Sequence, residues 1–184
     1  MPTYPINYPT NSRLQPRNIE FTSRTLTTRF QSPFTGKTQI YRYGGQWWEL
    51  NVTLAPLFQS DAEELTGFLN ALTGAGDQFG TFYFPLPSKF LISSTVSITT
   101  TSTGNDFTVS SGTVQVGKFG YDSTSNRLVQ FTTATSLFPK LNPSTAYSIN
   151  TTSKAKMRLV NSDITYTVDE FMLTNVTIPM IEAI

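Results

Sequence analysis

The chain has 184 residues, of which 14% are charged, and it contains neither cysteine nor histidine. This length fits one domain, or one domain with a modest elaboration, that buries a real core without disulfides. The two missing residue types exclude a disulfide framework, thiolate metal sites, thiol nucleophiles and a Ser-His-Asp triad. No apolar run reaches the length of a membrane span, and the first residues lack a signal-peptide pattern. We therefore expect a soluble protein that makes no membrane contact.

The composition favours β-structure. The chain has 30 Thr, 18 Ser, 14 Phe and 8 Tyr, and 11 Gly and 11 Pro interrupt it. β-branched and aromatic residues suit pleated, half-buried strands. Aromatic residues are too frequent for a disordered chain. We expect a mainly β globular protein.

The net charge of +1 conceals an asymmetry along the chain. Residues 1–43 hold six basic groups against Glu20 alone, whereas residues 163–184 hold four acids and no base. A nucleic-acid binder usually concentrates more Lys and Arg on one surface. A solvated basic face is one interpretation. The other is that the basic and acidic edges meet, within one subunit or between neighbours in a head-to-tail ring.

The first residues predict an extended arm and then a strand. Residues 1–20 carry four prolines and few aliphatic residues, so we expect an arm that orders when a partner or the domain body holds it. Residues 21–30 alternate weakly and predict a strand, followed by a turn over 32–36. We treat residues 21–184 as a single β-rich domain, with a change of texture near residue 87.

A Gly-Gly pair lies between two strand-like runs. Residues 38–43 and 46–54 flank Gly44-Gly45, a pattern that predicts a tight hairpin. Adjacent residues of a strand face opposite ways, so Trp48 is expected in the core and Trp47 outside. An outward tryptophan indicates a protein partner, with sugar stacking as the alternative.

The period then changes to that of one helix over about residues 60–73. Ser60 and Glu63 have the spacing of a capping box at its start. An apolar stripe should face a sheet and leave Asp61 and Glu64 outward; it consists of Leu65, Phe68, Leu69 and Leu72. Gly74 and Gly76 are expected to end the helix.

The rest of the chain consists of strand-like runs separated by turn signals. After an aromatic run over 79–84, these runs cover 90–98, 106–110, 113–119, 127–132, 146–149, 156–160, 164–168 and 171–181. This spacing predicts a β-sandwich or split β-barrel with one flanking α-helix.

No motif predicts catalysis. The neighbouring carboxylates Glu63-Glu64 and Asp169-Glu170 are explained by a helix start and a strand end. Oxygen-rich stretches near 104–106 and 122–126 fit turn chemistry and lack calcium-loop spacing. We predict no enzyme, no cofactor and no metal site.

The block from Tyr43 to Pro85 resembles tailed-bacteriophage distal tail or tail-hub proteins and related minor tail proteins. The resemblance rests on the aromatic strand over 46–57, the helix opened by Asp61-Ala62-Glu63, the exit over 69–74 and Phe79-Gly80-Thr81-Phe82. It implies a structural virion protein of the phage tail, assembled in the host cytoplasm. Such a protein forms a homohexameric ring that connects the tail tube to the tail tip, hub or baseplate proteins. The tape-measure protein and DNA are partners only as contents of the lumen.

The chain is expected to be too short for the additional carboxy-terminal carbohydrate-binding-like domain of larger members. Two alternatives stay open: a carbohydrate-binding tip module or adhesin, and a tail tube or terminator protein of related fold. Ring closure by pairing of β edges is the hypothesis, with the first 20 residues ordered across the next subunit. The candidate subunit-interface residues are Arg24, Arg29, Arg42, Trp47, Asp163, Asp169 and Glu170.

Overall fold

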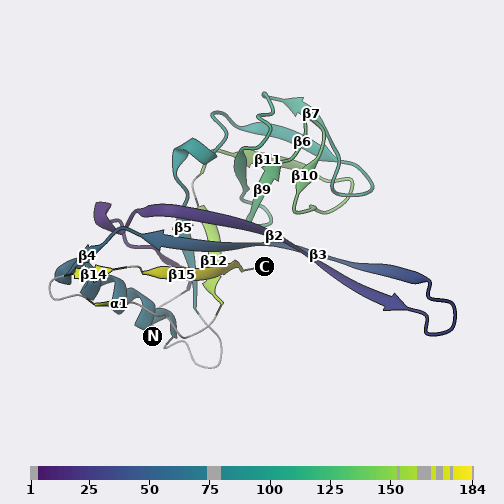
Figure 1. The fold of residues 1–184 in the computed structure, drawn as a ribbon. Helices are drawn as coiled ribbons and strands as arrows, with labels where there is room; N and C mark the ends of the chain where they lie inside the picture. Colours follow the sequence, from purple (N-terminus) through teal and green to yellow (C-terminus); the bar gives the residue numbers. More distant parts are fainter. Residues whose placement is uncertain are drawn as a thin grey trace.

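The structure, a computed structural model, describes residues 4–73, 80–152, 154–160, 167–168, 172–174 and 176–183. Across these residues the chain is mainly β, with two six-stranded sheets, a three-stranded sheet and one α-helix (Figure 1). This confirms the predicted fold class.

The first sheet has the strand order β1-β5-β12-β15-β3-β2. Its strands are β1 (Ile6–Asn7), β2 (Pro16–Gln31), β3 (Thr38–Leu54), β5 (Thr81–Pro85), β12 (Lys154–Leu159) and β15 (Thr177–Glu182). Alternate residues of its strands are buried, as Phe82 and Phe84 on β5 show. One face of this sheet therefore belongs to a core.

Helix α1 (Gln59–Thr73) supplies the other side of that core. Leu65, Leu69 and Leu72 are buried as the periodicity predicts, and Phe68 packs edge-on against Phe82 with ring centroids 5.4 Å apart. The helix lies beside the three-stranded sheet of β4 (Leu57–Phe58), β13 (Thr167–Val168) and β14 (Met172–Thr174) (Figure 1).

Two details of the helix start differ from the prediction. The helix begins at Gln59, before Ser60, and the Glu63 carboxylate accepts a hydrogen bond from the Gln59 side-chain amide at 3.1 Å. Asp61 is buried instead of outward, because Asn11 donates to it at 2.8 Å from the first residues of the chain. Gly74 and Gly76 lie outside the described residues.

The second sheet is an insertion between two neighbouring strands of the first. β5 and β12 pair side by side, yet the chain between them forms a separate sheet with the order β10-β9-β8-β11-β6-β7. Its strands are β6 (Val96–Thr100), β7 (Phe107–Ser111), β8 (Phe119–Asp122), β9 (Arg127–Phe131), β10 (Leu137–Phe138) and β11 (Ala146–Asn150). The insertion has its own hydrophobic cluster, and the change of texture near residue 87 falls just before it.

The run predicted as a strand over 113–119 is wrong up to residue 118, because this stretch is a loop in which Gly117 has a φ of +83°.

Aromatic and charged contacts join the inserted sheet to the first. Trp48 of β3 packs against Phe119 and Phe138, with ring centroids 5.2 and 4.8 Å apart, and its indole N–H donates to the Leu128 carbonyl at 3.1 Å. Nearby, Arg127 of β9 pairs with Glu182 of β15 at 3.3 Å. The inserted unit is thus fixed where β3 enters the core.

The hairpin predicted at Gly44-Gly45 is wrong. β3 runs continuously through both glycines and pairs with β2, and the chain reverses over residues 32–37 instead. The register shifts between Thr25 and Thr27 of β2, opposite the glycines, and Gly44 has a φ of +77°. Glycine tolerates this left-handed conformation, so the pair forms an irregularity of the strand and not its end.

Residues 4–20 lie against the body of the same chain. Tyr8 and Leu14 are buried in the first core, and β1 pairs in parallel with β5. β2 already begins at Pro16. The described part of the expected arm is therefore held by its own domain.

Candidate assembly surface

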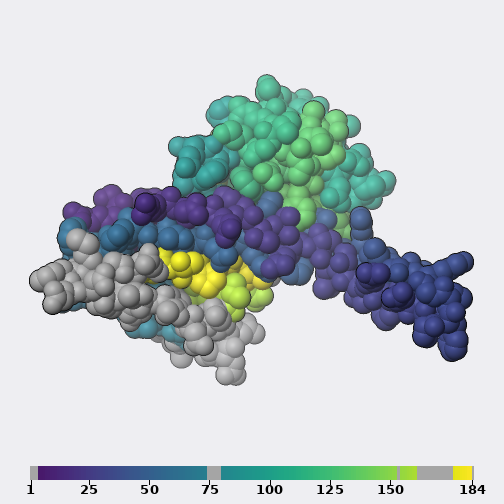
Figure 2. Space-filling model, in the orientation of Figure 1, coloured from purple at the N-terminus to yellow at the C-terminus, as the bar shows by residue number. Residues whose placement is uncertain are grey.

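A long two-stranded hairpin projects from the first sheet. The outer parts of β2 and β3 and the turn between them, residues 23–43, leave the body of the molecule as a thin ribbon (Figures 1 and 2). No residue in this range is buried, and all except Thr28 and Ser32 are exposed. We call this segment the hairpin arm. It contributes nothing to either hydrophobic cluster.

One face of the hairpin arm is aromatic. The pairs Thr28–Tyr41 and Phe30–Gln39 place their side chains on one side of the ribbon, and strand alternation adds Leu26 and Tyr43. Phe30 and Tyr41 meet edge-on, with ring centroids 5.7 Å apart. This aromatic face consists of Leu26, Phe30, Tyr41 and Tyr43, which are between 45 and 59% exposed.

The opposite face carries positive charge. The pairs Thr27–Arg42 and Arg29–Ile40 place both arginines on one side, and the Arg29 guanidinium donates to the Thr38 hydroxyl at 3.4 Å. Including Lys37 in the turn, residues 21–48 contain four basic groups and no acid. We call the side of Arg29 and Arg42 the cationic face. Two chemically different faces on one exposed ribbon are suited to two different contacts.

At the root of the arm, two of the predicted interface residues are used within the chain. Arg24 forms an ion pair with Glu49 at 2.8 Å, and the Trp47 indole N–H donates to the same carboxylate at 3.4 Å. The three side chains lie together because Arg24 pairs with Trp47 across the two strands. Arg24 therefore already has a charged partner within the chain, and its place at a subunit interface stays a prediction.

The acidic half of the predicted interface, which consists of Asp163, Asp169 and Glu170, lies outside the described residues. Glu182, the other acid of that stretch, is buried against Arg127 and accepts hydrogen bonds from the backbone N–H groups of Trp48 and Leu128. It stabilises the joint between the two sheets and is not a surface group.

The two tryptophans face opposite ways, as predicted. Trp48 is 4% exposed and packed among aromatic rings, so it cannot stack on a sugar. Trp47 is only partly buried, which leaves it as the one tryptophan that a glycan or a protein partner could reach.

Sequence reasoning missed the hairpin arm as a unit. The alternation of Leu26, Thr28 and Phe30 was visible, as was that of Gln39, Tyr41 and Tyr43. The Gly-Gly pair, however, suggested a chain reversal at the wrong place. The turn predicted over 32–36 is confirmed: it is the true chain reversal between β2 and β3, and it ends at Gly36, which has a φ of +65°.

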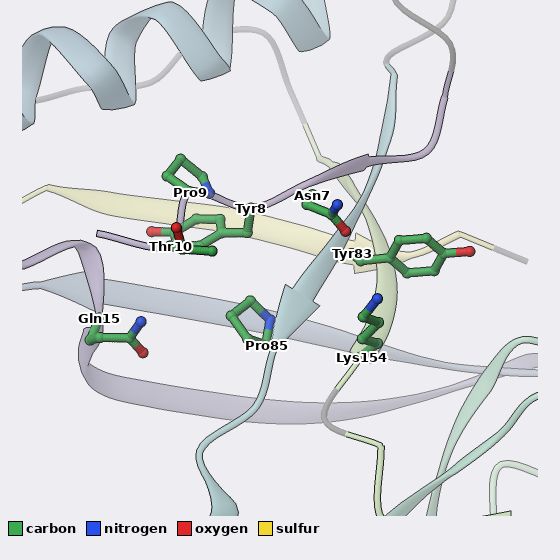
Figure 3. Close-up of a pocket in the computed structure, with 8 residues that line it drawn as sticks. All are labelled: Asn7, Tyr8, Pro9, Thr10, Gln15, Tyr83, Pro85 and Lys154. Atoms are coloured by element: carbon green, nitrogen blue, oxygen red, sulfur yellow. The ribbon is translucent and has the colours of Figure 1, made fainter. Parts of the chain in front are cut away.

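An open pocket of about 500 Å³ lies at the edge of the first sheet opposite β2, where β1 pairs with β5 (Figure 3). Its lining consists of Asn7, Tyr8, Pro9, Thr10, Gln15, Tyr83, Pro85 and Lys154. Lys154 is its single charged side chain, with the ammonium nitrogen 5.4 Å from the centre of the Tyr83 ring. Burial raises the pKa of the Tyr8 hydroxyl far above its ordinary value, and this hydroxyl donates to the Leu14 carbonyl at 3.0 Å.

Neither a metal centre nor a membrane helix appears in the described part of the chain. Within those residues, no three or more Asp and Glu side chains gather in a way that could hold a metal ion. The helix that the structure describes is too short and too polar to cross a bilayer.

Comparison with known proteins adds no relative. No family model matches the chain, and no curated protein matches its sequence.

Proposed function

We propose that this chain is a structural subunit of a phage tail, in the distal tail or tail-hub ring that connects the tail tube to the tail tip or baseplate. The sequence resemblance supports the tail. The observation that carries an assembly role is the hairpin arm, which exposes four large apolar side chains on one face and buries none of its own.

An exposed apolar ribbon of this kind is expected to be covered by a binding partner. Contiguous apolar surface on a soluble protein marks a contact site or an aggregation hazard, and long unpaired edges are hazardous for the same reason. Tyr and Arg are also enriched among the residues that dominate binding energy at interfaces. The arm combines both types, so we expect its two faces to be covered in the assembled particle.

The tail tube or terminator role requires the same surface. Tail tubes and tail terminators are also assemblies of repeated subunits, and an exposed hairpin arm suits them as well as it suits a distal ring. Labelling of intact virions with an antibody against the inserted sheet distinguishes them: label at the distal end of the tail supports the ring adaptor. Label along the tube or at the head-proximal end contradicts it.

Self-association of the purified full chain is the first experiment. Light scattering should give a mass of about six times the 20.5 kDa of one chain, and negative-stain images should show closed rings. A monomer at every concentration up to about 100 µM, where even weak specific contacts are populated, contradicts the proposal. A monomer that binds glycans and loses them on Trp47→Ala favours the tip-module alternative instead.

A further inference from the structure

The hairpin arm and helix α1 lie at opposite ends of the molecule (Figure 1). β3 runs from one to the other, since it begins beside the turn of the arm and is followed by β4 and then α1. Its 17 residues span about 55 Å at the usual rise of about 3.3 Å per residue. One copy of the chain therefore cannot bring its own arm to its own helix.

The two ends carry opposite charge. The hairpin arm, residues 23–43, has four basic groups and no acid, and three of them remain when Arg24, which pairs with Glu49, is set aside. Helix α1 has three acids and no base. Asp61 is buried against Asn11 and lies 3.8 Å from Arg13, so its charge is used within the chain. Glu63 and Glu64 are exposed and adjacent on the outer surface of the helix, and each accepts a hydrogen bond from a neutral side-chain amide, Gln59 at 3.1 Å and Asn11 at 3.0 Å.

The helix end also has an apolar element. Phe58, at the end of β4 and directly before the helix, is 45% exposed, and the Arg13 guanidinium lies 4.5 Å from the centre of its ring. We call Phe58, Glu63 and Glu64 the acidic end. The cationic face of the arm has the complementary composition, with two arginines beside Ile40, which is 63% exposed.

We propose that the cationic face of the hairpin arm docks on the acidic end of a second copy of this chain. The inference rests on the proposed function and specifies the subunit contact within it. Arg29 and Arg42 face Glu63 and Glu64 of the next copy, and Ile40 packs beside its Phe58. Because the two surfaces are different and lie at opposite ends, the contact is head-to-tail, and it repeats until a ring closes.

This arrangement assigns different work to the two faces of the arm. Exposed ion pairs contribute little affinity, but they fix orientation and exclude wrong partners. The charges therefore set the register between neighbouring copies. The aromatic face points away from the acidic end and remains available to a further contact in the assembled tail.

Charge exchange tests the contact directly. The variant Arg29→Glu/Arg42→Glu should weaken self-association at least about tenfold, and Glu63→Lys/Glu64→Lys should do the same. All four substitutions combined in one chain should restore assembly to within about threefold of the wild type. The matched control is Lys89→Glu/Arg158→Glu, which makes the same change of net charge away from both surfaces and should leave assembly unchanged.

Cysteine crosslinking provides a second measurement. The chain has no cysteine, so Arg42→Cys/Glu64→Cys introduces the only two thiols. Oxidation should produce a ladder of linked copies, since the two sites lie too far apart to join within one chain. Arg42→Cys/Asp106→Cys, with its second site on the inserted sheet, should give no ladder.

The outcomes separate this inference from the proposed function. If the full chain stays monomeric, the proposed function fails and this contact with it. If rings form and tolerate Glu63→Lys/Glu64→Lys, or if the four-fold exchange fails to restore assembly while circular dichroism shows a folded chain, the ring stands and this contact is wrong.

Discussion

Single residues at the root of the hairpin arm decide whether the arm keeps its shape. Gly44 has a φ of +77°, a conformation that costs an L-residue about 1–2 kcal/mol, whereas Gly45 does not require it. A Cβ at Gly44 would also lie 2.8 Å from the Lys140 ammonium nitrogen, which is flexible enough to move aside. At Gly45 the nearest atom would be an ordinary 3.5 Å away.

We therefore predict that Gly44→Ala lowers the free energy of unfolding by about 1–2 kcal/mol. Gly45→Ala should lower it by less than half as much, because the new methyl group meets no close contact. Urea unfolding of the two variants beside the wild type measures this difference. Equal losses would show that the left-handed conformation is not a requirement at residue 44.

Glu182 is the second residue whose role can be tested alone. Its carboxylate, with 1% of the side chain exposed, pairs with Arg127 and accepts from the backbone N–H groups of Trp48 and Leu128. Removing one partner of a buried ion pair costs about 3–5 kcal/mol, since the remaining charge stays buried. Glu182→Leu should therefore destabilise the chain by about that amount.

Calorimetry reports more than the size of this loss. With Glu182 present, the two sheets should unfold in one thermal transition. Glu182→Leu should divide this transition into two, because it loosens the inserted sheet from the first sheet. Glu20→Gln, a change at an exposed acid of β2, should stay within about 0.5 kcal/mol of the wild type. If Glu182→Leu were as stable as Glu20→Gln, the claim that Glu182 holds the two sheets together would be wrong.

Among the elements, the hairpin arm should be dispensable for folding and required for assembly. None of its residues from 23 to 43 is buried, so shortening it removes no core contact. We predict that replacing residues 28–41 with Asn-Gly, a two-residue turn that joins the paired Thr27 and Arg42, leaves the melting temperature within a few degrees of the wild type. The trimmed chain should nevertheless be monomeric by analytical ultracentrifugation.

A conservative variant separates the aromatic face from the length of the arm. Phe30→Gln/Tyr41→Gln keeps the ribbon and removes two exposed rings that pack edge-on. It should keep the fold and leave self-association of the purified chain within about threefold of the wild type, because the aromatic face points away from the acidic end. A loss of about tenfold or more would place the aromatic face in the subunit contact and contradict the docking proposed for the cationic face.

Elements with one clear period were predictable from the sequence, and elements defined by distant pairing were not. Helix α1 and the inward side of β3 follow from the spacing of Leu65, Leu69 and Leu72 and from the alternation around Trp48. The continuity of β3 through Gly44-Gly45 depends on its partner β2, which no local pattern specifies. Asp61 was misplaced for the same reason, because Asn11 holds it from 50 residues away.

In the whole molecule, the inserted sheet and the hairpin arm both extend from the first sheet, at different places along it. The first sheet carries the arm at one end and α1 at the other, and the inserted sheet rises beside the middle of β2 and β3 (Figure 1). β5 and β12 are neighbours in the first sheet, but nothing in their sequences predicts that a separate sheet is inserted between them. The change of texture near residue 87 was its only trace.

The mass of the full chain compared with that of the arm-trimmed chain tests the central claim most directly. The account predicts a closed oligomer of about six copies for the full chain and a folded monomer for the trimmed chain, measured side by side by light scattering at equal concentration. A full chain that remains a single copy, or a trimmed chain that forms the same oligomer, would contradict it.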